Sequence, residues 1–159
     1  MNGLPDWLCP MICVNPWTQQ TFAVLYEIFE RDFKETKPVY SGSIVWFFPN
    51  IEDGKEVLFW HLTHREDMST DERLPDLRRS ERLPWVRKMI DHSDKPEVFA
   101  WDYKESSGDI RTYVWLKNYD FLVLMKMYPN GRRRLITSYY VDHGHKRRKL
   151  EKKYAKRIK

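Results

Sequence analysis

Four short runs rich in aromatic and β-branched residues occupy residues 98–141, and they constrain the fold more than any other feature of the chain. The runs are VFAWDY (98–103), IRTYVWL (110–116), FLVLMKM (121–127) and RRLITSYYV (133–141). They are separated by sequences that contain the turns SSGD, KNYD and PNG. Because short turns join neighbouring antiparallel strands, the pattern predicts a four-stranded antiparallel meander.

Helical patterns flank the predicted sheet. After Thr18, which is a good N-cap residue, apolar side chains recur at helical spacing. A second, short helix is expected to open at Pro84. In the basic C-terminal segment Leu150, Tyr154 and Ile158 lie four residues apart, which predicts a terminal helix with a thin apolar stripe.

A further hairpin is predicted before the meander, with strands at 43–48 and 56–62 joined around an Asp53–Gly54 turn. The predicted fold class is α+β, with an N-terminal helix and a C-terminal basic helix around the meander and this hairpin. A chain of 159 residues suffices for one compact unit. Within it, residues 1–40 are expected to form an irregular segment and a helix, and residues 41–159 the main domain.

Basic residues are concentrated at the C-terminal end. The chain has 28 Lys and Arg against 23 Asp and Glu, and residues 146–159 contain nine of the basic residues but only one acidic residue. The rest of the chain is therefore slightly acidic. A tail with this charge indicates a polyanionic partner. Its predicted contacts with that partner begin with Lys146, Arg147 and Arg148.

The sequence also bears on the compartment and on cofactors. Cys9 and Cys13 are too few for a disulfide framework and fit reduced thiols in the cytoplasm. A metal site at their spacing has weak support, so no metal and no cofactor are predicted. The N-terminal segment does not resemble a secretion signal, and no apolar stretch approaches the ~20 residues of a membrane span. We expect a soluble, cytoplasmic protein without a membrane partner.

Alternation along the strands separates two faces of the predicted sheet. The face with Val114 and Val123 is expected to be the core, covered by the N-terminal helix. The opposite face combines basic and aromatic residues: Arg111, Tyr113, Trp115 and Lys126. If exposed, such a face suits single-stranded nucleic acid, because rings stack on bases and cations neutralise phosphates. The alternative is that the aromatic residues are simply buried, beneath residues 64–82.

Residues 64–82 are the most polar part of the interior, and a long connection of this kind often carries function. His61 and His64 lie at its start, at the end of a predicted strand, where an imidazole suits acid–base chemistry. Five arginines of this segment suit a phosphate site: Arg65, Arg73, Arg78, Arg79 and Arg82. The alternative is a structural histidine beside a solvated run of charges. Motifs typical of ATPases, dinucleotide-binding enzymes and zinc proteases do not occur in the sequence.

Four blocks, in this order, resemble a known group of nucleases: FWHLTHRED (59–67), LPDLRRSERLPWV (74–86), GDIRTYVWL (108–116) and LITSYYVDHGHKRRKLEKKY (135–154). Together they resemble phage-associated nucleases of the Barnase–EndoU–Colicin–RelE-like superfamily. The last block is also similar to the end of RelE-like and BrnT-like toxins. The resemblance implies a small α+β domain that cleaves RNA without a metal, through attack by the ribose 2′-OH.

The resemblance implies roles and partners as well. His61 would be a general base or acid, and Arg79 and Arg82 would bind phosphate. The last strand would contribute Thr137 or Ser138, together with Tyr139. The implied substrate is tRNA or ribosome-associated mRNA, and an antitoxin or inhibitor protein is an implied partner.

Three functions are therefore open at this point. The first is a metal-independent endoribonuclease, toxin-like or phage-borne. The second is a module that binds nucleic acid on the same fold without cleaving it, in which case binding would depend strongly on salt. The third is a phage counter-defence protein that acts through a protein partner.

Overall fold

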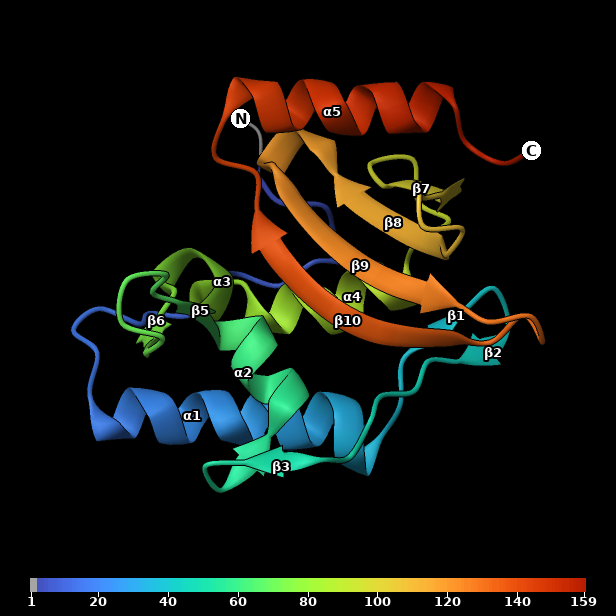
Figure 1. Ribbon diagram of the computed structural model, residues 1–159. Coiled ribbons are helices and arrows are strands. Elements are labelled where there is room, and N and C mark those ends of the chain that lie inside the picture. Colours follow the sequence, from blue (N-terminus) through green and yellow to red (C-terminus); the bar gives the residue numbers. More distant parts are fainter. Residues whose placement is uncertain (1–2) are drawn as a thin grey trace.

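The computed structural model describes residues 3–159 and has an α+β fold (Figure 1). Its central sheet consists of β7 (Phe99–Lys104), β8 (Ile110–Leu116), β9 (Phe121–Met127) and β10 (Arg133–Tyr140). The strands are antiparallel in the order β10-β9-β8-β7, so the predicted meander is confirmed. A register shift between Leu135 and Thr137 interrupts the β9–β10 pairing, and the 3-10 helix η2 (Lys117–Tyr119) lies between β8 and β9.

The main core lies on the face of the sheet that carries Val114 and Val123. Helix α2 (Val57–Thr63) packs against β10, and α4 (Leu83–Asp91) packs against β8 and β9. Helix α1 (Gln19–Phe29), continued by the π-helix η1 (Glu30–Glu35), packs on α2 and α4. The prediction that the N-terminal helix itself covers the sheet was therefore wrong, because two shorter helices lie between them.

Helix α5 (Gly144–Ala155) covers the other face of the sheet (Figure 1). Its buried Leu150 and half-buried Tyr154 pack in a second core with Trp101, Tyr113 and Trp115. Trp115 is 1% exposed and Tyr113 is 3% exposed. The predicted exposed aromatic face was therefore wrong. The alternative, burial, holds, but α5 rather than residues 64–82 provides most of the cover.

The segment 56–62 was predicted as a strand, and this was wrong. It forms most of α2, because Leu58, Phe59 and Leu62 are buried together at helical spacing. The Asp53–Gly54 turn is present, with both residues at positive φ, but it joins only the short strands β3 (Ile51–Glu52) and β4 (Lys55–Glu56). The segment 43–48 contributes β2 (Ser43–Ile44), paired with β1 (Val39–Tyr40), and a single parallel bridge from Trp46 to Arg134 of β10.

Residues 64–82 are also more regular than expected. They contain the antiparallel pair β5 (His64–Glu66) and β6 (Arg73–Pro75), followed by α3 (Leu77–Glu81). The other predicted helices are present: Thr18 caps α1 through the backbone N–H of Thr21, and α4 begins one residue before Pro84. In the terminal helix Leu150 and Tyr154 form the predicted stripe, but Ile158 lies beyond the end of α5 and is exposed. Among the helices of residues 3–159, none is long and apolar enough to cross a membrane.

Candidate functional site

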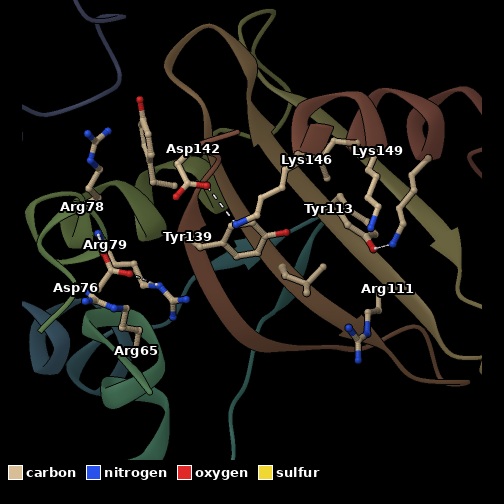
Figure 2. A pocket seen from close by; sticks show the side chains of 14 residues that line it. Arg65, Asp76, Arg78, Arg79, Arg111, Tyr113, Tyr139, Asp142, Lys146 and Lys149 are labelled. Atoms are coloured by element: carbon tan, nitrogen blue, oxygen red, sulfur yellow. Dashed lines mark hydrogen bonds and ion pairs between the residues drawn. The ribbon is translucent and has the colours of Figure 1, made fainter. Parts of the chain in front are cut away.

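A pocket of about 730 Å³ lies between α3, the sheet and α5, and we call it the basic pocket (Figure 2). Its polar walls come from all three parts of the fold, with β5 contributing beside α3. Seven cationic side chains line it: Arg65, Arg78, Arg79, Arg111, Lys146, Lys149 and Lys153. Only two carboxylates, Asp76 and Asp142, line it with them. The pocket is therefore strongly positive, and it suits an anionic ligand.

Several of these cations have no carboxylate partner. Arg111 lies on the α5-covered face of β8, two residues before Tyr113, because alternate strand residues share a face. Within residues 3–159 no carboxylate lies within salt-bridge distance of Arg65, Arg78, Arg111 or Lys149. The buried Nε of Arg111 also lacks a hydrogen-bond partner there. Buried donors are normally satisfied, so an incoming acceptor would be stabilised at this end of the pocket.

Arg79 is anchored at the opposite end. Its Nη1 donates to the backbone carbonyls of His61 (2.8 Å) and His64 (3.2 Å), and its Nε lies 3.1 Å from the Asp76 carboxylate. Asp76 also caps α3 by accepting the backbone N–H of Arg79. Burial lowers the pKa of Arg79, but an arginine keeps its charge in proteins. Arg79 thus joins α2 to α3 while its guanidinium lines the pocket.

Of the three tyrosines that line the pocket, Tyr113 and Tyr139 belong to the second core. Lys153 of α5 donates to Glu105 (2.9 Å) and to the Tyr113 hydroxyl (2.8 Å), and that hydroxyl donates to Glu105. Burial, with the adjacent Glu105, raises the pKa of Tyr113. Burial also raises the pKa of Tyr139, so both phenols remain protonated at neutral pH. Tyr113 is committed to the contact with α5, whereas among residues 3–159 no hydrogen bond holds the Tyr139 side chain, which lines the same pocket (Figure 2).

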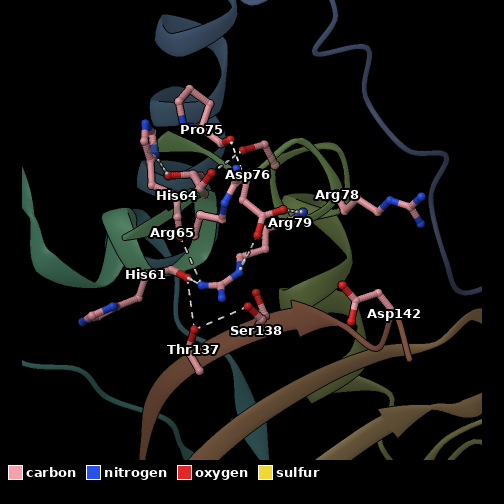
Figure 3. A network of polar contacts seen from close by, with 12 residues as sticks. His61, His64, Arg65, Pro75, Asp76, Arg78, Arg79, Thr137, Ser138 and Asp142 are labelled. Carbon is pink, nitrogen blue, oxygen red and sulfur yellow. Dashed lines mark hydrogen bonds and ion pairs between the residues drawn. The ribbon is translucent and has the colours of Figure 1, made fainter. Parts of the chain in front are cut away.

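His61 lies outside the basic pocket. It is in the last turn of α2 and is exposed, and its carbonyl rather than its ring accepts from Arg79 and from Thr137 Oγ1 (3.1 Å). The imidazole points away from the Arg79 guanidinium (Figure 3). It lines a neighbouring cavity of about 620 Å³, the side cavity, which Arg65 and Arg79 also line. Desolvation, then the charge of Arg79, lowers the pKa of His61, so the ring is neutral at pH 7.

His64 is a packed, neutral side chain. It is 8% exposed, and aromatic rings surround it, those of Trp17 and Trp60 at 5.5 and 5.0 Å. The Thr63 hydroxyl donates to Phe59, so His64 Nδ1 must donate to Thr63 Oγ1, 2.8 Å away. Burial lowers the pKa of His64 to about 4. This environment fits a structural role for His64, the alternative to acid–base chemistry. The imidazole nevertheless lines part of the side cavity.

The remaining predicted site residues are dispersed. Arg82 is 9% exposed and lines a different pocket, Ser138 is fully buried, and Lys126 is 3.7 Å from Asp109. On α5, Lys146 is 3.2 Å from Asp142, Arg147 pairs with Asp120, and Arg148 is exposed but does not line the basic pocket. Trp115 is covered by α5, as described above. Of the predicted set, the basic pocket gathers Arg65, Arg78, Arg79, Arg111, Tyr113, Tyr139 and Lys146.

Sequence reasoning missed Lys149 and Lys153 as pocket residues. A signal for the two lysines was present, since Lys146, Lys149 and Lys153 share one face of a helix. Arg78 was one of the five arginines predicted to bind phosphate, and α3 carries it into the pocket. Among residues 3–159 no group of three or more His, Cys, Asp or Glu side chains is arranged to hold a metal ion.

Comparisons with protein-family models, with curated proteins and with solved structures find no match to this chain. The resemblance to the nuclease superfamily therefore stays a prediction. A functional proposal for this protein therefore rests on the geometry and charge of the basic pocket.

Proposed function

We propose that this protein binds single-stranded RNA in the basic pocket. The observation that carries the proposal is the convergence of seven cationic side chains with only two carboxylates on one pocket. Phosphate groups supply most of the affinity in such complexes, since their neutralisation releases counterions. Tyr139 and Tyr140 also line the pocket, and aromatic rings beside cations favour an unpaired strand, whose bases are free to stack.

Salt dependence tests this proposal directly. Each phosphate contact on a single strand contributes a slope of about −0.7 to log Kobs against log salt. Four cations without carboxylate partners therefore predict a slope of about −3, and engagement of all seven about −5. The measurement is fluorescence anisotropy of a labelled single-stranded RNA from 50 to 300 mM KCl, with polyglutamate as a competing polyanion.

A matched pair of variants locates the site. Arg111→Gln removes an unpaired charge from the pocket and should reduce the slope by about 0.7. Arg132→Gln removes the same charge from the exposed β9–β10 turn and should leave the slope nearly unchanged. Binding that is insensitive to salt, or equal losses in the two variants, would contradict the proposal. Competition by polyglutamate as strong as by RNA would indicate charge attraction without RNA recognition.

A second candidate function is metal-independent cleavage of the bound RNA. The observation that favours it is that Arg65 and Arg79 line both cavities, with Tyr139 in one and the neutral His61 imidazole in the other. In such a reaction the 2′-OH attacks phosphorus and gives its proton to His61. The bond to the 5′-oxygen breaks, and that oxygen takes a proton from Tyr139, while the arginines stabilise the charge on the phosphorane.

The cleavage test uses RNA incubated with the protein in EDTA. His61→Ala and Tyr139→Phe should each slow cleavage by about 10²–10⁴-fold, the usual contribution of a general acid or base. Both variants should keep the salt slope of binding, since neither loses a cation. Intact RNA with the wild-type protein, or equal cleavage by the wild type and both variants, would refute this second function and leave binding standing.

A further inference from the structure

A second pocket of about 600 Å³ adjoins the basic pocket, and Tyr140 lines both. We call it the aromatic pocket. It is lined by Arg82, Trp85, Asn118, Tyr119, Asp120 and Tyr140, together with residues of the N-terminal segment. The Trp85 and Tyr119 rings meet edge to face at 6.1 Å. The pocket thus combines ring surfaces with a few polar groups, as small-molecule sites usually do.

Arg82 supplies unused N–H donors to this pocket, although its charge is paired with Glu81. It is 9% exposed, and its guanidinium lies 4.8 Å from the Tyr140 ring and 5.4 Å from the Trp85 ring. Its Nη1 donates to the Arg78 carbonyl (3.0 Å) and to Glu81. Within the described residues its other two nitrogens have no acceptor, and the Nε is buried. A buried donor without an acceptor costs stability, which a ligand acceptor would recover.

We infer that the aromatic pocket binds a nucleobase that carries a keto oxygen beside its imino N–H, in the class of uracil and guanine. The inference rests on the proposed function, because the base would belong to a nucleotide whose phosphate lies in the basic pocket. Tyr140 connects the two, since Arg78 of the basic pocket lies 4.4 Å from the same ring that Arg82 contacts. The cation that neutralises the RNA phosphate and the arginine that contacts the base would thus both lie against the Tyr140 ring.

The chemistry of the walls sets the preference. A guanidinium only donates hydrogen bonds, so Arg82 favours a keto oxygen and disfavours the amino group that adenine presents at the same position. The exposed Asn118 amide both donates and accepts, so its oxygen can take the imino proton. Tyr119 offers a ring face for stacking.

The experiment compares labelled hexauridylate with hexaadenylate, two strands of equal charge, by anisotropy at fixed salt. Wild-type protein should bind hexauridylate about tenfold more tightly, the size expected of one good base-edge contact. Asn118→Ala and Arg82→Lys should each reduce the ratio to about threefold or less. Neither should change the affinity for hexaadenylate by more than about twofold. Circular dichroism checks the fold of Arg82→Lys, because Arg82 also bonds the Arg78 carbonyl.

The outcomes separate the two proposals. If wild-type protein binds neither strand, RNA binding itself is wrong and this inference falls with it. If it binds both strands equally, RNA binding stands and the base pocket is refuted. If Asn118→Ala keeps the preference for hexauridylate, the base pocket is also refuted, because the base would then be recognised at another site. This outcome does not depend on whether Arg82→Lys folds.

Discussion

Replacement of Leu150 by alanine should raise the population in which α5 is undocked, without unfolding the rest of the chain. Leu150 is the only residue of this helix that is fully buried, at 5% exposure, and it packs on the second core with Trp115. Leu→Ala substitutions in protein cores cost about 2–5 kcal/mol. A terminal helix can settle partly into the space, so we expect the lower end, about 2 kcal/mol. That cost raises the undocked population about thirtyfold.

Native-state hydrogen exchange measures this effect by region. Amides in α5 should exchange about thirtyfold faster in Leu150→Ala, while amides of β9 should keep their protection. Ile158→Ala is the matched control: Ile158 is 46% exposed, so its loss should leave α5 protection nearly unchanged. Unchanged exchange in Leu150→Ala would refute the anchor, and equal acceleration in α5 and β9 would refute independent docking.

Two further predictions concern stability. Because the pKa of His64 falls to about 4 on folding, the unfolded chain binds a proton that the folded chain does not once the pH drops below about 6.5. His64 should therefore lower the free energy of unfolding by about 3 kcal/mol as the pH falls from 6.5 to 4. Urea titration at both pH values measures this decrease, and the decrease should be correspondingly smaller in His64→Phe. Thr18→Ala removes the side-chain cap that accepts from Thr21 N–H and should cost about 1 kcal/mol in the same assay, whereas Ser106→Ala, in the exposed turn between β7 and β8, should cost less than about 0.5. Equal losses in the two variants would contradict the capping role.

The parts of the fold that were predicted correctly depend on local chemistry. The turns SSGD, KNYD and PNG fix the β7–β10 meander, and Thr18 and Pro84 set the start of two helices, whatever packs around them. The strand prediction for residues 56–62 was wrong because a short apolar run has no clear period. Packing then decides between strand and helix. Here burial of Leu58, Phe59 and Leu62 against one neighbouring surface favours the helix.

The candidate site could be predicted only in part, because its walls come from distant segments. Arg79, Arg111 and Lys149 are dozens of residues apart, and they meet only after α5 returns across the sheet. The same return buries Trp115, which alternation alone placed on an exposed face. A face rich in aromatic and basic residues is equally compatible with solvent, nucleic acid or a covering helix, and strand periodicity does not distinguish these.

The docked position of α5 also changes what the basic C-terminal segment does. A free tail would attract a polyanion without positioning it, whereas α5 is held by Leu150, by Lys153 with Glu105, and by Arg147 with Asp120. These contacts use two of its cations to fix the helix, and they leave Lys149 without a carboxylate partner among the described residues, facing the pocket. Because fixed charges lose little entropy on binding, the helix acts as one wall of the site. Anion affinity should therefore depend on Leu150, which carries no charge, as well as on the lysines that it positions.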